Sequence, residues 1–473
     1  MHPAPDQEPH AAQEPKLSPR APGAGTAPAR TQAPLEHDAA VDRSGTIAAA
    51  VLALAWVGVA VAMLSRPIFI SHDSLSNNVH VAFIADSLRT GHGLPLHIAS
   101  LANGEALTFP YGSVPWLFAA ALWPLLGDRA VTLALVLGFA ATVVATFWAF
   151  PELRRGWWAA ATLANPALVI SPLLGQLPFL WSTAFFLTSI GLWRRRSWGW
   201  AAAAAAIAQI IHPAVMMPIV AVIALGSVRF EEPGQRRRLV SLWLVSVIVA
   251  LPAAWAVLQS PVVAQTSPFV QFIALVQTVS MRFLVVAVPL GLAVLTRRPL
   301  PRWTMAGVTA VFVLLQFPMY QPFGMDFAWG SLWRNPDTSV VAFVDSGGVG
   351  DGLTHRVLSG SDGKYGLYAV AEAGGVLDSE FFPEGLHRGP FSSTGQYARF
   401  LGGRHVDRVV VFPSYRRRYG HSNEPQVLEQ MVRAGCVEGV EVTRDIAASD
   451  RPSAGSPSAP RWAVYDVGYN CSG

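Results

Sequence analysis

Residues 114–127 read VPWLFAAALWPLLG, and this stretch decides how the rest of the chain is arranged. It is strongly apolar but only 14 residues long, and it contains Pro115 and Pro124. A helix that crosses a membrane needs about 20 apolar residues, so the stretch is short for a crossing. Because each crossing reverses the side of the following loop, the sidedness of every later segment depends on whether residues 114–127 cross.

Apolar stretches on both sides of it predict a polytopic membrane protein. Hydrophobic residues make up 52% of the 473 residues and charged residues only 14%, whereas soluble domains carry about 25% charged residues. The net charge is +4, but the basic residues fall in short runs between apolar segments, so we expect no nucleic-acid partner. If residues 114–127 do not cross, the predicted spans are nine: 44–64, 129–150, 157–172, 175–193, 198–211, 214–228, 239–258, 281–295 and 303–320.

The placement of arginines favours this arrangement. Suppose that residues 114–127 form an interfacial helix at the outer surface and that the N-terminus is cytoplasmic. The inner connections then carry twelve arginines, whereas the outer connections at 171–176, 212–213 and 259–280 carry no Lys or Arg. If the stretch crosses instead, all twelve lie outside, against the excess of Lys and Arg in cytoplasmic loops. The twelve are Arg154, Arg155, Arg194, Arg195, Arg196, Arg229, Arg236, Arg237, Arg238, Arg297, Arg298 and Arg302.

Composition divides the chain into three regions. Residues 1–43 contain eight prolines and no periodic apolar face, which predicts a disordered cytoplasmic tail. Residues 44–325 are the predicted transmembrane domain, with a first outer loop at 65–113. Residues 336–473 alternate short β-rich runs with helix-like stretches, which predicts a small α/β domain. The predicted fold is mainly α: a polytopic transmembrane helix bundle of about nine spans with a C-terminal extracytoplasmic α/β domain.

Both cysteines of the chain, Cys436 and Cys471, lie in this last region. If the region faces an oxidising compartment, the two can form a disulfide, and with no third cysteine the pairing has no alternative. A bridge that closes a loop of this length would stabilise the domain by about 3–4 kcal/mol in the chain-entropy model.

The first outer loop carries polar residues close to the membrane. It begins with SHDS at 71–74, continues through an amphipathic segment at 79–88 and ends with FPYGSVPW at 109–116. An acidic residue just above the first span, followed by surface helices and a Tyr/Pro/Gly entry into an interfacial helix, resembles the GT-C superfamily. Those enzymes take sugars from polyprenyl-phosphate carriers, and the acid of their first outer loop acts as general base or binds metal. Asp73 is the matching position.

The residue types suit that chemistry. Sugar transfer from a phosphate-linked donor needs a carboxylate to take the proton of the acceptor hydroxyl and cations to stabilise the departing phosphate. Asp73 and His72 are the predicted catalytic residues, and His80, Tyr111 and Arg282 are the predicted substrate-binding residues of this half. Plainer alternatives stay open: Asp73 as a solvated boundary residue of a helix, and Arg282 as a side chain that snorkels to lipid phosphate.

Further polar residues lie on the same predicted side. His212 and Gln176 could line the site, although His212 could simply end its helix. His80, His92 and His97 lack the spacing of zinc ligands, so no metal site is predicted from them.

A second resemblance lies in the last region. Its runs look like the C-terminal region of the membrane family labelled "6-pyruvoyl-tetrahydropterin-synthase-related", whose members also share a His-Asp first loop that matches His72-Asp73. The sequence shows no zinc-binding His constellation or catalytic Cys that would suit a pterin synthase, so that activity is not carried over. The runs are RVLSGSDGKY at 356–365, GGVLDSEFFPE at 374–384, QYARFL at 396–401, RHVDRVVV at 404–411 and NE at 423–424.

Three acidic residues of this region, Asp378, Glu380 and Glu384, lie within seven positions. They could bind a divalent cation, which is the one cofactor that the sequence suggests, or sugar hydroxyl groups, or they could form an acidic surface turn. GT-C enzymes often carry outer domains that hold the acceptor, so the resemblance makes Glu380 and Glu384 candidate acceptor-binding residues.

The resulting prediction is a multi-pass glycosyltransferase of a bacterial plasma membrane. It would move a sugar from a polyprenyl-phosphate donor in the lipid bilayer to a cell-envelope glycan or protein acceptor on the outer face. Two alternatives are a transport or assembly component of envelope polysaccharide export and a non-catalytic member that uses its outer domain for binding. A transporter would usually show intramembrane ionisable residues or repeated broken helices, which the sequence does not suggest.

Overall fold

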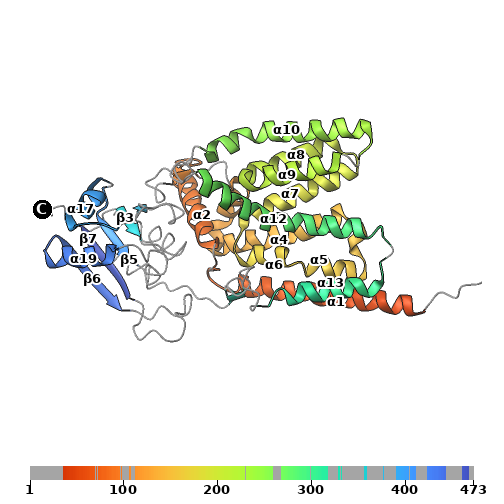
Figure 1. Cartoon of the computed structure of the whole chain (residues 1–473), viewed down its shortest axis with the longest axis horizontal. Coiled ribbons are helices and arrows are strands. Elements are labelled where there is room, and N and C mark those ends of the chain that lie inside the picture. The colour runs from red at the N-terminus through yellow and green to blue at the C-terminus, as the bar shows by residue number, and fades with distance from the viewer. Residues whose placement is uncertain are drawn as a thin grey trace, which may run out of the picture. The chain divides into compact units, whose positions relative to one another are not determined.

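A computed structural model of the chain is mainly helical (Figure 1). By contacts the chain divides into two units, residues 1–40 and 41–473, and only residues 36–40 of the first are described, as the beginning of helix α1. The structure describes residues 36–69, 71, 73–95, 97–98, 106–107, 112–228, 231–258, 268–298, 300–317, 329–330, 332, 356–359, 376–377, 390–403, 405–411, 423–443 and 461–467.

Most helices of the second unit form one bundle around an apolar core. Helix α4 packs against α7, α7 against α8, and α8 and α9 against α10, while α5 contacts α13. Buried residues such as Leu135, Leu180 and Met216 belong to this core. The helices are α1 (Glu36–Leu64), α2 (Ser74–Arg89), α3 (Ser113–Leu126), α4 (Arg129–Ala149), η2 (Pro151–Arg154), α5 (Gly156–Leu163), α6 (Pro166–Leu173), α7 (Leu177–Arg194), α8 (Trp198–Ile211), α9 (Pro213–Val228), α10 (Pro233–Leu258), α12 (Pro268–Leu295) and α13 (Arg302–Leu314).

Three helical segments of the described chain are long and apolar enough to cross a membrane: Arg43–Leu64, Arg129–Ala149 and Pro233–Ala256. Their outer faces are apolar as well, since Leu54 on α1 is 70% exposed and Ile248 on α10 is 62% exposed. Water would not favour such faces, whereas lipid would. The prediction of a mainly helical membrane protein is therefore confirmed in part. The count of nine spans stays a prediction, because helices such as α8 and α9 are shorter.

The predicted span at 157–172 consists of two helices, α5 and α6, with a break at residues 164 and 165. Pro166 lacks an N–H and disfavours a helical conformation at Asn165, whose side chain instead accepts a hydrogen bond from the Ala167 N–H. The carbonyl groups at the break have partners from distant parts of the chain. Trp56 of α1 donates to Leu163 O at 3.2 Å, and the Gln316 side chain donates to Ala164 O at 2.7 Å.

Three of the predicted spans belong to helices that begin several residues earlier than the sequence suggested, and one of these, α10, begins at Pro233 instead of residue 239. Helix α1 begins at Glu36 instead of residue 44, although its apolar part still begins at Arg43. Helix α12 begins at Pro268, so residues 268–280, predicted as part of an outer connection, are helical and continuous with the apolar segment after them. Gln271 and Gln277 lower the hydropathy of these residues, so a helix start predicted from hydropathy falls too late in the sequence.

The C-terminal part contains a mixed five-stranded sheet in the order β4-β3-β5-β7-β6. Strand β3 runs parallel to β4 and β5, and β7 runs antiparallel to β5 and β6, with Val409 opposite Tyr465. The extracytoplasmic location of this region stays a prediction. The elements are β3 (Arg356–Ser359), β4 (Val376–Leu377), α17 (Thr394–Gly403), β5 (Arg408–Val411), α19 (Glu424–Arg433), β6 (Val437–Thr443) and β7 (Arg461–Val467); a short pair, β1 (His97–Ile98) and β2 (Ala106–Leu107), lies in the predicted first outer loop.

Residues of the QYARFL and NE runs hold α17 and α19 together. The buried Tyr397 hydroxyl donates to the Glu424 carboxylate, which is also buried. Asn423 accepts a hydrogen bond from the Phe391 N–H and donates one to the Phe391 carbonyl, both at 2.7 Å. Cys436, after α19, is disulfide-bonded, whereas Cys471 lies outside the described residues.

Candidate functional site

Asp73 stands at the beginning of α2, immediately after the predicted membrane boundary. Its N–H donates to the carbonyl of Leu174, in the connection between α6 and α7, at 2.8 Å. Its carboxylate makes no capping hydrogen bond to α2. The backbone of Asp73 is therefore fixed against a neighbouring connection, while its carboxylate is directed to something other than its own helix.

Asn77 strengthens this attachment one turn into α2. Its amide nitrogen donates to the carbonyls of Asp73 at 2.8 Å and of Gly175 at 2.9 Å. Asn77 is buried, so these bonds lie away from water and hold the two segments in register.

Gly175 allows the close approach. Its φ is +74°, in the left-handed region that glycine adopts readily. A Cβ at this position would lie 2.5 Å from the Ser74 backbone nitrogen and 2.5 Å from Ser71 Oγ. The connection between α6 and α7 can therefore lie against the first turn of α2 only because residue 175 has no side chain.

The entry into α3 lies at the same place. The Gly112 N–H donates to the carbonyl of Ile211, the last residue of α8, at 2.9 Å. In α3, the Trp116 indole N–H donates to Asn77 Oδ1 at 2.8 Å, and its ring stacks on His80 with centroids 4.1 Å apart. Four parts of the chain therefore meet at one end of the bundle: the starts of α2 and α3, the end of α8 and the connection between α6 and α7. We call this the Asp73 end.

Arg282 of α12 completes the arrangement. Its guanidinium lies 4.0 Å from the Asp73 carboxylate, and both side chains remain partly accessible, with exposed fractions of 19% and 16%. The guanidinium also lies over the ring of Phe179, 5.5 Å from the centroid, which is a cation–π geometry. The structure thus brings together Asp73 and Arg282, the acid and the cation that were predicted from the sequence to act in the same reaction.

His212 lies beside this pair, in the connection between α8 and α9. It is buried and meets the Phe179 ring edge-on, with centroids 6.4 Å apart. Burial and, after it, the positive charge of Arg282 lower the pKa of His212 to about 3, with Asp73 acting in the opposite direction. The imidazole is therefore neutral near pH 7, and its neighbourhood provides one carboxylate and one guanidinium.

His80 is placed differently from a residue that contacts a substrate directly. It is buried, its Nδ1 lies 2.6 Å from the carbonyl of Ser76, and its ring lies against Trp116. A ring nitrogen next to a carbonyl must carry the proton, so Nδ1–H is occupied as a donor. The substrate-binding role of His80 stays a prediction.

Several predicted site residues lie outside the described residues, and their roles stay predictions. They are His72, Tyr111, Glu380, Glu384 and Cys471. Among the described ones, Gln176 is half-buried at the beginning of α7, and His92 is exposed and hydrogen-bonded to Thr90 Oγ1 at 2.8 Å. The described residues hold no group of three or more His, Cys, Asp or Glu side chains placed to bind a metal ion.

Sequence reasoning missed three members of the site: Asn77, Trp116 and Phe179. Asn77 stands one turn after Asp73, a spacing that places both on one helix face and could have been noticed. Phe179 and Trp116 look like ordinary apolar residues in the sequence, so only the packing of α7 and α3 reveals them.

Comparison with models of known protein families and with curated proteins found no match for this chain.

Proposed function

We propose that this protein is a membrane glycosyltransferase of GT-C type, which transfers a sugar from a polyprenyl-phosphate donor to a cell-envelope acceptor. One observation carries the proposal. Asp73 and Arg282, on elements far apart in the sequence, form a partly accessible ion pair at one end of an apolar helix bundle. A substrate with a lipid tail and a charged head would present its head at such an end.

The two charges match the two demands of the reaction. As the acceptor oxygen bonds to the anomeric carbon, Asp73 takes the proton of the acceptor hydroxyl. The bond between that carbon and the phosphate oxygen breaks, and the phosphate leaves with the electron pair and an additional negative charge. Arg282 stabilises this charge with its planar set of N–H donors. The Phe179 ring packs against the guanidinium. The guanidinium therefore keeps its position when the Asp73 carboxylate changes protonation state.

The proposed membrane orientation places the Asp73 end outside. Gly112, just before α3, bonds to Ile211, and Arg129 Nε, at the start of α4 shortly after α3, bonds to Arg66 O at 3.3 Å, just after α1. An interfacial α3 that returns to the side where it began accounts for both bonds. The arginine-rich connections after α4 and α7 then face the cytoplasm, as the positive-inside rule requires. A reporter fused after Gly473 is expected to be extracytoplasmic.

The C-terminal region is proposed to hold the acceptor, with Glu380 and Glu384 as binding residues. This part of the proposal rests on the sequence resemblance and on the acidic pattern alone, and it is independent of the Asp73–Arg282 pair.

The test uses membranes that contain the full chain and radiolabelled polyprenyl-phosphate pentoses and hexoses as donors. The variant Asp73→Asn keeps the shape of the side chain but removes the base, and it is expected to lower transfer about 100-fold or more. Arg282→Gln is expected to lower transfer and weaken donor binding together. The matched control is Asp86→Asn, because Asp86 lies on the same helix, is exposed and pairs with Arg89.

Full transfer by Asp73→Asn would remove the proposed base and contradict the mechanism. A wild-type protein that transfers no sugar but promotes appearance of the labelled lipid on the opposite side of the membrane would support the alternative, a transport or assembly component.

A further inference from the structure

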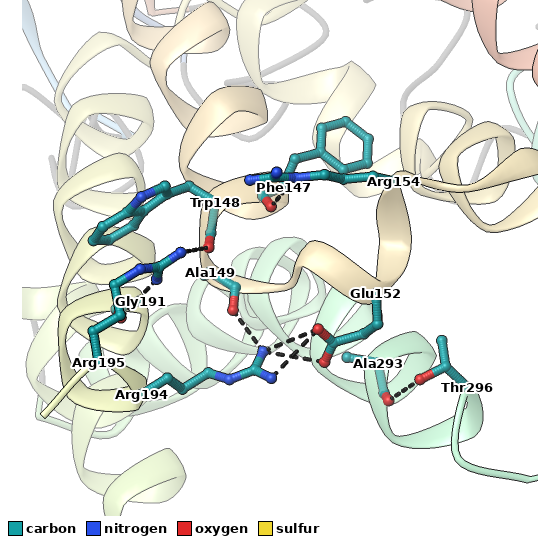
Figure 2. Close-up of polar contacts among 10 residues, drawn as sticks. All are labelled: Phe147, Trp148, Ala149, Glu152, Arg154, Gly191, Arg194, Arg195, Ala293 and Thr296. Atoms are coloured by element: carbon teal, nitrogen blue, oxygen red, sulfur yellow. Dashed lines mark hydrogen bonds and ion pairs between the residues drawn. The ribbon is translucent and has the colours of Figure 1, made fainter.

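At the opposite end of the bundle, three arginines lie around the end of α4, as Figure 2 shows in close-up. The last carbonyl groups of a helix have no partner within it and form the negative end of its dipole. Here three consecutive carbonyls each receive a hydrogen bond from a different guanidinium. The pairs are Arg154 Nε with Phe147 O at 2.9 Å, Arg195 Nη2 with Trp148 O at 3.0 Å, and Arg194 Nη1 with Ala149 O at 2.5 Å.

We call Arg154, Arg155, Arg194, Arg195 and Arg196 the arginine collar. All five are exposed, and the carboxylate that meets them among the described residues is Glu152, which bonds to Arg194 at 3.1 Å. The collar is therefore strongly positive. Part of the collar has no hydrogen-bond or ion-pair partner within the described part of the chain. This part consists of the Nη atoms of Arg154 and the side chains of Arg155 and Arg196.

Arg196 occupies a position that normally belongs to glycine. Its φ is +62°, in the left-handed region. The Arg196 N–H donates to Trp193 O and the Ser197 N–H to Leu192 O, which is the hydrogen-bond pattern of a Schellman motif at the end of α7. Glycine would adopt this conformation without strain, whereas arginine is strained in it. Arg196 is thus a charged residue whose side chain has no partner among the described residues, and its backbone conformation is unfavourable. This combination indicates that its charge has a function.

Exposed tryptophans at this end are typical of a region at the depth of lipid headgroups. Trp200 and Trp303, which lie beside the arginine-rich connections, have exposed fractions of 74% and 75%. Trp193 and Trp198 pack edge-on with centroids 4.5 Å apart, and Arg238 lies over Trp198. Tryptophan is enriched at membrane–water interfaces, because its ring is apolar and its N–H is polar.

From these observations we infer that the arginine collar binds the phosphodiester of an anionic glycerophospholipid in the adjacent leaflet. Arg154, Arg155 and Arg196 supply the N–H groups, while Arg194 and Arg195 remain attached to α4. Guanidinium groups bind phosphate oxygens in pairs, and α4 is held directly behind them. Each arginine of this kind contributes about fivefold to the affinity for anionic lipid. This site is separate from the Asp73 end and does not depend on the proposed reaction.

The test titrates the detergent-purified full chain with dioctanoyl-phosphatidylglycerol and follows the rise of Tm. Dioctanoyl-phosphatidylcholine is the neutral control, and inorganic phosphate at equal ionic strength is the soluble-anion control. We expect phosphatidylglycerol alone to raise Tm with saturation. Arg196→Gly is expected to keep at least the wild-type Tm without lipid and to bind phosphatidylglycerol about fivefold more weakly. Arg89→Gln, which changes an exposed arginine at the last residue of α2, outside the collar, should bind it like wild type.

Three results would overturn the inference. They are an equal rise of Tm with phosphatidylcholine, an equal rise with inorganic phosphate, and an unchanged affinity for phosphatidylglycerol in Arg196→Gly. Because Arg196→Gly relieves backbone strain, a failure of this variant to fold would itself contradict the argument. The double variant Arg154→Gln/Arg155→Gln gives a second measurement at unstrained positions, and it too should bind phosphatidylglycerol more weakly.

Discussion

The side-chain amide of Asn77 donates a hydrogen bond to the carbonyl of Gly175 across the interface between α2 and the connection from α6 to α7, at 2.9 Å. The same side chain accepts the indole N–H of Trp116. One buried amide therefore joins the element that carries Asp73 to two others, and the position of the Asp73 carboxylate depends on it.

Asn77→Ala is the first predicted perturbation. It leaves the Trp116 N–H and the Gly175 carbonyl without this partner in a buried place, at about 1–3 kcal/mol for each unpaired group. We expect a Tm several degrees below wild type in the same detergent, together with reduced transfer activity. The neighbouring Asn78→Ala is the control, because Asn78 is equally buried but its Oδ1 has no hydrogen-bond partner among the described residues. A similar loss in both variants would contradict the role given to Asn77.

Gly175→Ala is the second. An alanine there must adopt a left-handed conformation, at about 1–2 kcal/mol, and its Cβ must displace the first turn of α2. Gly91→Ala separates these two effects, because Gly91 has a similar φ, +79°, and the same helix-end hydrogen bonds, but has open space around its would-be Cβ. We expect a small fall of Tm in Gly91→Ala, and in Gly175→Ala a larger fall with loss of transfer. Equal effects would mean that the close approach at Gly175 is unimportant.

The chemically important residues could be predicted from the sequence, whereas the packing that brings them together could not. Asp73 and Arg282 could be proposed from the sequence, because an acid just after an apolar helix and a cation inside another are unusual residue types for their places. That they meet could not be predicted, since it depends on how α12 packs against α2 and α7. The role of Gly175 was hidden for the same reason.

The break between α5 and α6 shows a different kind of miss. Asn165-Pro166 is a local signal for a helix end, and it can be recognised from the sequence alone. The prediction of a span over residues 157–172 rests on their hydropathy, and hydropathy does not respond to a break in the helix. A break inside a membrane is tolerated where neighbouring side chains bond to the freed carbonyls. Those side chains, Trp56 and Gln316, come from distant parts of the chain and carry no local signature.

Gln316→Leu tests this explanation. The leucine fills a similar volume but leaves the Ala164 carbonyl without its partner, which costs about 1–3 kcal/mol where water is excluded. We expect a lower Tm and faster proteolysis in detergent. Gln176→Leu, a half-buried glutamine at the start of α7, is the matched control and should leave Tm near the wild-type value. If Gln316→Leu is as stable as wild type, the break has another source of stability.

The last prediction concerns Asp128, which lies in the connection between α3 and α4, outside both helices. Burial raises the pKa of this carboxyl from 3.8 to about 6, and its Oδ1 has no hydrogen-bond partner among the described residues. The folded state therefore binds the proton more tightly than the unfolded state. The resulting stabilisation is complete below pH 3.8 and is lost as the pH rises through about 6.

At pH 7.5 the wild-type protein must hold a poorly solvated carboxylate at this position, whereas Asp128→Asn holds a neutral amide of the same shape. We expect the variant to be more stable there by about 1–3 kcal/mol, an upper range set by the size of the pKa shift. Near pH 4 the wild-type carboxyl is mostly protonated, so the difference should shrink toward zero. The measurement is Tm of both proteins between pH 4 and 8 at constant ionic strength. A gain that is independent of pH would show that the asparagine acts through packing and that Asp128 is not a strained charge.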